Sequence, residues 1–203
     1  MKANKVITIG REFGSGGREI GVKLAEKLGI PFYDKEIISM AAEAGGLNAS
    51  FIEAHEEKAP MAGATGMGRI AFSSFSFQPT FSDTIFIAQC NIIKELAAKG
   101  PCVIVGRCAD YSLRNTDALH VFVRGTMEYK IARKRPMAPE KADYTDAQMQ
   151  KWMEGVDKQR AKYYEHYTDT RWGDSRHYDL CINTDGIGCD GAVELILKRL
   201  ELE

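Results

Sequence analysis

The feature that most constrains the fold lies near the start of the chain, where a β-branched run leads into a glycine cluster and then into a helical pattern. Residues 6–19 read VITIGREFGSGGRE. In such a strand–turn–helix, glycines let backbone N–H groups close around oxygen atoms, and the helix N-terminus adds partial positive charge. The sequence therefore predicts a phosphate-binding loop after the first strand. A glycine turn that only packs the helix on the sheet is the alternative.

The composition excludes several other classes of protein. The chain has 203 residues, of which 44% are hydrophobic and 27% are charged, so it can bury the core of one domain. Its formal net charge of −1 gives no general attraction to nucleic acid. No apolar stretch approaches the roughly 18 residues that span a bilayer, and the cysteines show no CxxC pair. We expect a cytoplasmic protein without nucleic-acid or membrane partners, in which Cys102 and Cys181 are packed free thiols.

Short apolar runs alternate with helical patterns along the chain. The runs that predict strands are residues 5–9, 31–33, 102–105, 118–123 and 178–183. The patterns that predict helices cover about 16–28, 35–45, 48–58, 82–99, 126–135, 145–166 and 190–201. Thr145 and Gln148 have the spacing of a capping box at the start of one of them. The alternation predicts an α/β three-layer sandwich, with a parallel sheet of about five strands, formed as a single domain over residues 1–203.

Ligands of parallel sheets bind beyond the carboxyl ends of the strands, and several candidate residues are expected to meet there. Gly10, Asp34, Gly106 and Arg107 each follow a predicted strand. The Arg107 guanidinium could form two hydrogen bonds to a phosphate, or it could cap the strand at the surface. Asp34 is a candidate base or metal partner, with a helix N-cap before Lys35 as the alternative.

Cationic residues flank the glycine cluster and recur later in the chain. Arg11 and Arg18 border the cluster and supply positive charge. Arg133, Lys134 and Arg135 end a predicted helix, where cations suit the helix dipole. These three residues could equally belong to a lid that brings positive charge over a transferring phosphate.

Two further arginines, Arg160 and Arg171, bracket an aromatic stretch. They suggest a phosphate clamp on a mobile hairpin, and a structural network is an equal alternative for each. Asp157 stands three positions before Arg160, a helical spacing that predicts an ion pair. Asp110 could accept a hydrogen bond from a sugar hydroxyl or a base amine, or it could cap its loop.

The segment from Ala59 to Thr80 differs from the rest of the chain. It is rich in glycine and contains a run of serines and phenylalanines. Long loops of this kind are usually functional or disordered, so we expect a partly mobile segment. The phenylalanines at positions 72, 75, 77 and 81 could belong to a flap or to a hydrophobic contact with a second subunit. A homodimer is therefore a possible assembly.

In their order and spacing, several segments resemble the cytidylate kinase-like family of P-loop nucleoside monophosphate kinases. The segments are ITIGREFGSGGREIG, LAEKLGIPFYD, VIVGRCAD and YYEHYTDTRWGDSRHYDLCINT. The resemblance spans nearly the whole chain. It implies a parallel five-stranded core, an acceptor-binding flap over about 35–80 and a lid over about 133–172. It also implies transfer of the ATP γ-phosphate, with Mg²⁺, onto CMP or a similar small acceptor.

The resemblance and the residue pattern together assign the site as follows. The residues expected to bind ATP are Gly14, Ser15, Gly16, Gly17, Arg18, Glu19 and Arg133. Those expected to bind the acceptor are Asp34, Arg107 and Asp110. Arg18, Arg160 and Arg171 are the candidate catalytic residues, and Glu19 is the candidate metal ligand.

The phosphate loop departs from the usual GxxxxGK[ST] pattern. Gly17 takes the place of the lysine in an ungapped alignment, and Arg18 takes it after a shift of one residue. Either alignment puts Glu19 in the place of the hydroxyl residue. Cys108 stands where the family's Gly-Arg-Asp segment has its aspartate. Arg18 could supply the missing charge and Glu19 could bind metal. A nucleotide sensor or degenerate kinase without turnover is the alternative function.

Overall fold

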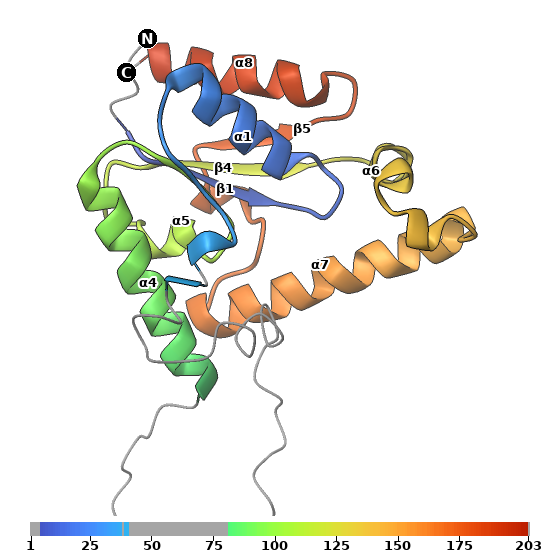
Figure 1. The fold of residues 1–203 in the computed structure, drawn as a ribbon, viewed down its shortest axis with the longest axis horizontal. Helices are drawn as coiled ribbons and strands as arrows, with labels where there is room; N and C mark the ends of the chain where they lie inside the picture. The colour runs from blue at the N-terminus through green and yellow to red at the C-terminus, as the bar shows by residue number, and fades with distance from the viewer. Residues whose placement is uncertain (1–4, 38, 41–80, 203) are drawn as a thin grey trace, which may run out of the picture.

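The computed structural model describes residues 5–37, 39–40 and 81–202, and its centre is a five-stranded parallel sheet (Figure 1). The strands are β1 (Ile7–Arg11), β2 (Phe32–Tyr33), β3 (Val103–Val105), β4 (Leu119–Arg124) and β5 (Leu180–Asn183). Their order across the sheet is β2-β3-β1-β4-β5, and every neighbouring pair is parallel. The predicted fold class is confirmed, since the strands alternate with helices that cover the sheet.

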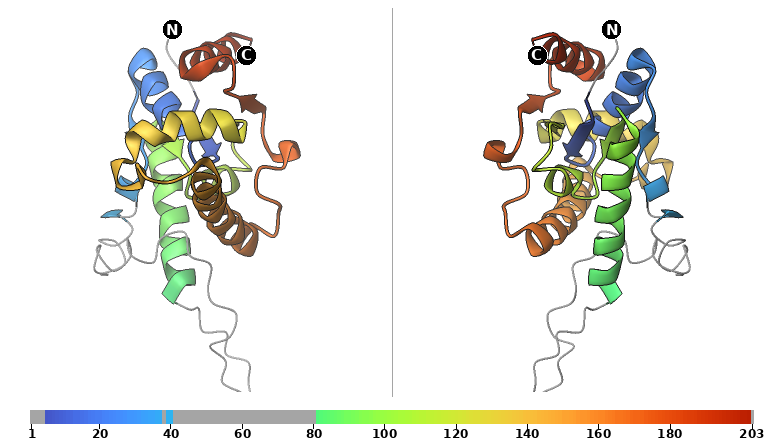
Figure 2. Two further views of the ribbon diagram at one scale, coloured as in Figure 1. Left: turned by 90° about the vertical axis from the view of Figure 1, so that its right-hand side faces the viewer. Right: turned by 90° about the vertical axis from the view of Figure 1, so that its left-hand side faces the viewer.

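Helices lie on both faces of the sheet (Figures 1 and 2). α1 (Gly17–Leu28) and α8 (Gly188–Glu201) pack together on one face. The other face carries α4 (Phe81–Lys99), the short α5 (Ala109–Ser112) and the long α7 (Asp146–Thr168), while α6 (Met127–Lys134) follows β4. The short 3-10 helices are η1 (Arg135–Met137), η2 (Pro139–Lys141) and η3 (Ser175–His177). The order is that of a three-layer α/β sandwich.

The core explains why the strands read as continuous apolar runs. Ile7, Ile9 and Val121 pack fully buried against α1 and α8. On the opposite face, Ile104 packs with Ile93 of α4. Strands buried on both faces need apolar residues at successive positions. The parallel pairing of β1 with β3 places the carboxyl ends of these two strands side by side.

Several element boundaries follow local chemistry that the sequence makes visible. The Thr145 hydroxyl accepts from the backbone N–H of Gln148, whose side-chain oxygen accepts from the Thr145 N–H at 2.8 Å. The predicted capping box is confirmed. The helix that it starts runs to Thr168, two residues beyond the expected end. The sequence analysis assigned no element to α5, because a single helical turn has no measurable periodicity.

The two cysteines expected to be packed differ in burial. Cys102 is buried, whereas Cys181 is exposed, so the expectation for Cys181 was wrong. β5 is an edge strand that turns Ile182 inward and its neighbours outward. None of the helices in the described ranges is both long and apolar enough to cross a lipid bilayer.

Some expectations fall on residues that the structure does not describe. Of the expected flap over about 35–80, residues 38 and 41–80 lie outside the described ranges. The same holds for the helical patterns between 41 and 58, for the segment 59–80 and for the phenylalanines at 72, 75 and 77. The side chain of residue 81 is also outside the description, so the expected dimer contact stays a prediction.

Candidate phosphate-binding site

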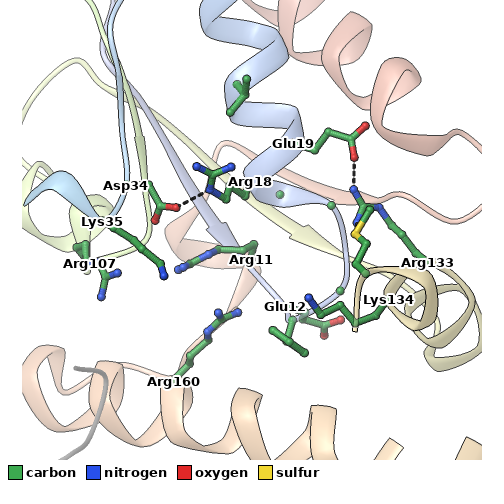
Figure 3. A pocket seen from close by; sticks show the side chains of 16 residues that line it. Arg11, Glu12, Arg18, Glu19, Asp34, Lys35, Arg107, Arg133, Lys134 and Arg160 are labelled. Atoms are coloured by element: carbon green, nitrogen blue, oxygen red, sulfur yellow. Dashed lines mark hydrogen bonds and ion pairs between the residues drawn. The ribbon is translucent and has the colours of Figure 1, made fainter. Parts of the chain in front are cut away.

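A cavity of about 530 Å³ lies beyond the carboxyl ends of the strands, where the glycine loop meets α1 (Figure 3). The loop after β1 forms one wall, and residues that follow β2 and β3 or belong to α6 and α7 form the others. Basic side chains outnumber acidic ones in this lining. The charged residues are Arg11, Glu12, Arg18, Glu19, Asp34, Lys35, Arg107, Arg133, Lys134 and Arg160.

The loop needs glycine at two of the predicted positions. Gly14 and Gly16 have φ angles of 85° and 94°, which residues with a Cβ rarely adopt. A Cβ on Gly16 would also lie 2.5 Å from Cys189 Sγ. Gly16 is the N-cap of α1, and no side chain in the described part of the protein caps that helix. The first turn of α1 therefore lines the cavity without a side-chain cap among the described residues, as an anion site requires.

Hydrogen bonds from neighbouring elements hold the loop in this shape. The buried Ser15 donates its hydroxyl to the Glu12 carbonyl at 2.8 Å. Thr184, which follows β5, donates its hydroxyl to the Ser15 carbonyl at 2.9 Å. The Phe13 N–H donates to the Asp157 carboxylate of α7 at 2.7 Å. Because Thr184 and Asp157 come from distant parts of the chain, the tertiary fold preorganises the loop.

Arg107 is a buried cation at the end of β3. Only 7% of the residue is exposed, and its φ of 59° lies in the left-handed region. The pKa of Arg107 is lowered to about 10, mainly by burial and in second place by repulsion from the nearby Arg11 guanidinium. Arg107 is therefore still a cation at neutral pH. A buried guanidinium beside a second one favours an anion between them.

Arg18 extends toward the wall of the cavity that the residues after β2 form. Its Nε donates to Asp34 Oδ2 at 2.9 Å (Figure 3). Its guanidinium also lies over the Phe32 ring. The Arg18 side chain is 64% exposed, whereas that of Asp34 is only 6% exposed. The buried Asp34 Oδ1 has no hydrogen-bond partner among the described residues. Arg18, which was predicted to bind ATP, and Asp34, which was predicted to bind the acceptor, thus form one ion pair.

Glu19, the predicted metal ligand, lies in the first turn of α1 and is held by two cations. Its carboxylate pairs with the Arg133 guanidinium of α6 and with Lys23 Nζ, the latter at 2.9 Å. The Lys23 hydrogen bond is the main reason that the pKa of Glu19 is lowered. Arg133, predicted to bind ATP, therefore joins α6 to the first turn of α1. Among the described residues, no group of three His, Cys, Asp or Glu side chains could hold a metal ion.

A second charged network joins the loop to α7. The buried Lys130 ammonium lies 3.0 Å from a Glu12 oxygen and 3.6 Å from an Asp157 oxygen. Arg160 lies 3.9 Å from Asp157, which confirms the predicted ion pair. Burial raises the pKa of Asp157. The Arg160 guanidinium also lies over the Phe13 ring, 5.5 Å from its centroid, so α7 contributes a cation directly to the cavity.

Three predicted site residues do not line the cavity: Ser15, Asp110 and Arg171. Asp110 is buried and accepts from the Tyr164 hydroxyl at 2.6 Å. It lines a neighbouring cavity of about 30 Å³ together with Cys108. Arg171 is exposed and does not line any described cavity. Ser15 lies buried within the loop, and the other predicted residues do line the main cavity.

The cavity also contains two cations that were not among the predicted binding or catalytic residues, although Arg11 was expected to supply charge beside the glycine cluster. Arg11 and Lys35 turn their cationic ends toward Arg107 and Arg160 (Figure 3). Arg11 is the last residue of the central strand β1, and this position at the end of a parallel strand was the available signal. Lys35 comes two residues after the end of β2 and had the same signal.

Comparisons with known proteins bear on this site. Among solved structures, an uncharacterized protein from Eubacterium ventriosum ATCC 27560 is 30% identical, covers 98% of this chain and 99% of its own, and has a TM-score of 0.70. Shikimate kinase from Bacteroides thetaiotaomicron is 15% identical over 97% of this chain and 98% of its own, with a TM-score of 0.55. Shikimate kinase from Aquifex aeolicus is 18% identical over 97% of this chain and 96% of its own, with a TM-score of 0.50. At such identities the two kinases support the fold only.

The sequence comparisons identify the family. No curated protein matches the chain. A sequence model of the cytidylate kinase-like family matches residues 6–186, which include the loop, both charged networks and the last strand. A kinase-like family and a kinase fold support a phosphotransferase in general. Because the match spans most of the sequence, the chain belongs to the cytidylate kinase-like family.

Proposed function

We propose that the protein transfers the γ-phosphate of ATP to a nucleoside monophosphate, with CMP as the first candidate acceptor. One observation carries the proposal: the glycine loop and the uncapped N-terminus of α1 open into a cavity where cations from several elements converge. The family supports phosphate transfer, and the cavity has the charge needed to neutralise it. The choice of CMP as the first candidate acceptor rests on the family resemblance.

The donor side of the proposed site is the loop itself. The backbone N–H groups of residues 14–18 would bind the β- and γ-phosphates of ATP, because the loop has the required glycine geometry. Arg133 and Lys134 enter the cavity from α6 and would add charge beside the donor. We infer that residues 133–172 act as the lid, since they also carry Arg160.

The acceptor side is built around Arg107. Its buried guanidinium would hold the acceptor phosphate with two hydrogen bonds. The ion pair between Arg18 and Asp34 forms the adjoining wall. In the transfer step, an acceptor phosphate oxygen forms the bond to the γ-phosphorus while the bond to the β–γ bridging oxygen breaks, and ADP leaves. Arg160 would neutralise the charge on the group in transfer. A catalytic role for Arg171 remains a prediction that its position does not support.

Magnesium fits this site as a partner of the nucleotide. Mg²⁺ is usually held by one or two carboxylates and by substrate phosphates, without a dedicated protein cage. Glu19 provides such a carboxylate in the cavity lining, and Lys23 and Arg133 orient it. When bound, the ion would neutralise charge on the donor phosphates.

The direct test is an acceptor panel with the purified chain and Mg-ATP. The panel contains nucleoside monophosphates and small alcohols, including shikimate, and product is measured by chromatography. We expect CMP to be phosphorylated fastest. A Gly14→Asp variant serves as control, because it places a carboxylate and a Cβ where the loop needs a positive φ. A panel in which no acceptor exceeds this control would refute the proposed transfer.

A nucleotide-binding sensor without turnover is the second candidate. The observation in its favour is that the loop lacks its lysine while Glu19 is already engaged by Arg133 and Lys23. Calorimetry with ATP, run beside the turnover assay, separates the two functions. ATP binding without any product supports the sensor. Loss of turnover with retained binding in Arg160→Ala supports the enzyme.

A further inference from the structure

Gly17 is glycine for a reason that differs from that of its neighbours. It is the first residue of α1 and, unlike Gly14 and Gly16, it does not have a positive φ. A Cβ on Gly17 would lie 2.5 Å from Arg11 Cβ and 3.0 Å from Arg11 Cγ. Real Cβ atoms do not approach other carbons so closely. The side chain of Arg11 therefore occupies the space that a side chain at position 17 would need.

A second glycine accommodates the other end of the same side chain. A Cβ on Gly106 would overlap Arg11 Nη1 and lie 2.8 Å from Arg11 Cζ. Arg11 thus begins at the end of β1, crosses the first turn of α1 at Gly17 and ends beside the turn after β3 at Gly106. The two glycines therefore leave room for this arginine at its stem and at its guanidinium end.

The guanidinium of Arg11 ends in the main cavity beside Gly106, next to Arg107. Because it lies beside Gly106, the residue before Arg107, its charge repels the Arg107 guanidinium and lowers the pKa of that group. Figure 3 shows Lys35 and Arg160 directed into the same region. Cations held together in a partly buried space favour a polyanion among them.

We propose that Arg11 provides the phosphate-binding cation that the loop lysine provides in GxxxxGK[ST] loops, and that it reaches the phosphates from β1 instead of from α1. The inference deepens the proposed function and rests on it. It also explains why the lysine is missing, because a lysine at position 17 and the stem of Arg11 cannot occupy the same space. Arg18, the other candidate for this role, is directed to Asp34.

The role differs chemically from that of a lysine. An ammonium is a point charge, whereas a guanidinium presents a planar set of donors. From its position Arg11 would hold the γ-phosphoryl group on the side that faces the acceptor and would stay bound to it during transfer. Arg11 neither gives nor takes a proton in this step. The phosphoryl group passes from the ADP oxygen to the acceptor oxygen.

The test measures tripolyphosphate binding by calorimetry and turnover with Mg-ATP. Arg11→Gly and Arg11→Gln remove the cation, and the latter keeps part of the stem if the glycine variant fails to fold. We expect each to weaken tripolyphosphate binding about tenfold or more, as for a lost charge-assisted contact. Arg176→Ala, an equal loss of charge at a residue outside the cavity, should leave the affinity unchanged.

A positional swap provides the sharper comparison. Gly17→Lys alone forces the new stem against Arg11 and should lose affinity. The double variant Arg11→Gly with Gly17→Lys removes that clash and returns a cation to the usual loop position. It should recover a measurable part of the tripolyphosphate affinity that Arg11→Gly loses. Recovery supports the inference, since a purely structural role of Arg11 would not be restored by a lysine elsewhere.

The outcomes separate this inference from the proposed function. Unchanged tripolyphosphate affinity in Arg11→Gln, with a large loss in Arg18→Ala, would overturn the inference and leave the transfer reaction standing. Binding that depends on Arg11 without phosphorylation of any acceptor would support the inference while refuting the transfer. Wild-type protein that does not bind tripolyphosphate would overturn the inference.

Discussion

At the scale of single residues, the glycines near the site show how different physical constraints select the same amino acid. Gly16 needs its positive φ and also has no room for a Cβ beside Cys189. Gly17 has ordinary backbone geometry and is limited only by Arg11. Gly155, in the middle of α7, has neither constraint, because open space surrounds its Cα. Alanine should therefore act differently at each position.

Gly16→Ala should destabilise the protein by about 1–3 kcal/mol, because a left-handed backbone conformation strains a residue with a Cβ and the methyl group meets Cys189. Urea unfolding measures the effect. The matched change Gly155→Ala should stabilise the protein by about 0.5–1 kcal/mol, as expected for an exposed helix interior. Equal effects at the two positions would contradict this interpretation of the loop.

Arg107 predicts a pH dependence of acceptor binding. Its lowered pKa of about 10 means that the guanidinium loses its charge as the pH rises through that value. The affinity for CMP should stay constant near neutral pH and fall as the pH approaches and passes about 10. Calorimetry across this range, with circular dichroism to confirm folding, provides the measurement. Arg107→Gln should bind weakly near neutral pH and should lack this fall, and a parallel fall in the variant would assign the titration to another group.

At the scale of elements, α7 is coupled to the phosphate loop through one carboxylate. Asp157 accepts the Phe13 N–H and lies near the buried Lys130. The loop conformation therefore depends on how α7 packs, although the two segments are far apart in the sequence. The capping box at Thr145 fixes the start of this helix and so the position of Asp157 along it.

Asp157→Ala should destabilise the protein by about 1–3 kcal/mol, because it leaves a buried N–H and a buried ammonium with fewer acceptors. Asp157→Asn should cost less, since its side-chain oxygen can still accept from Phe13, and burial already disfavours the charged aspartate. Urea unfolding gives both values. Glu154→Ala, an exposed change on the same helix, should stay within about 0.5 kcal/mol. A similar small effect of Asp157→Ala would show that the loop does not depend on α7.

At the scale of the whole molecule, the sheet topology brings cations from distant segments to one cavity. Arg11 comes from β1, Arg107 follows β3 and Arg160 belongs to α7. Their mutual repulsion opposes folding while no anion is present. An anion that binds among them should therefore stabilise the folded protein as a whole.

Tripolyphosphate should raise the melting temperature at low ionic strength. A free tripolyphosphate concentration of about 100 times the dissociation constant should add roughly 2.7 kcal/mol to the free energy of unfolding. The rise should shrink at a fixed ligand concentration as salt approaches about 1 M, where the Debye length is about 3 Å. Differential scanning calorimetry measures it. A rise that is insensitive to salt, or that persists in Gly14→Asp, would place the binding outside this cavity.

Much of the fold and part of the site can be read from the chain because their causes are local. The alternation of apolar strands and helical patterns predicts the parallel sheet, and Thr145 with Gln148 predicts the start of α7. Asp157 and Arg160 are one helical turn apart and form the expected ion pair. The short α5 and the exposure of Cys181 were missed, because neither a single turn nor an edge position leaves a periodic signal.

The sequence by itself determined the glycine loop, the fold class and the absence of the usual lysine, since each depends on residue types at short spacing. Only the tertiary structure decided which cations share the cavity: it directs Arg18 to Asp34, leaves Arg171 outside and lays Arg11 across Gly17. Side-chain direction depends on the space that neighbouring elements leave. That space exists only once the strands and helices have packed together.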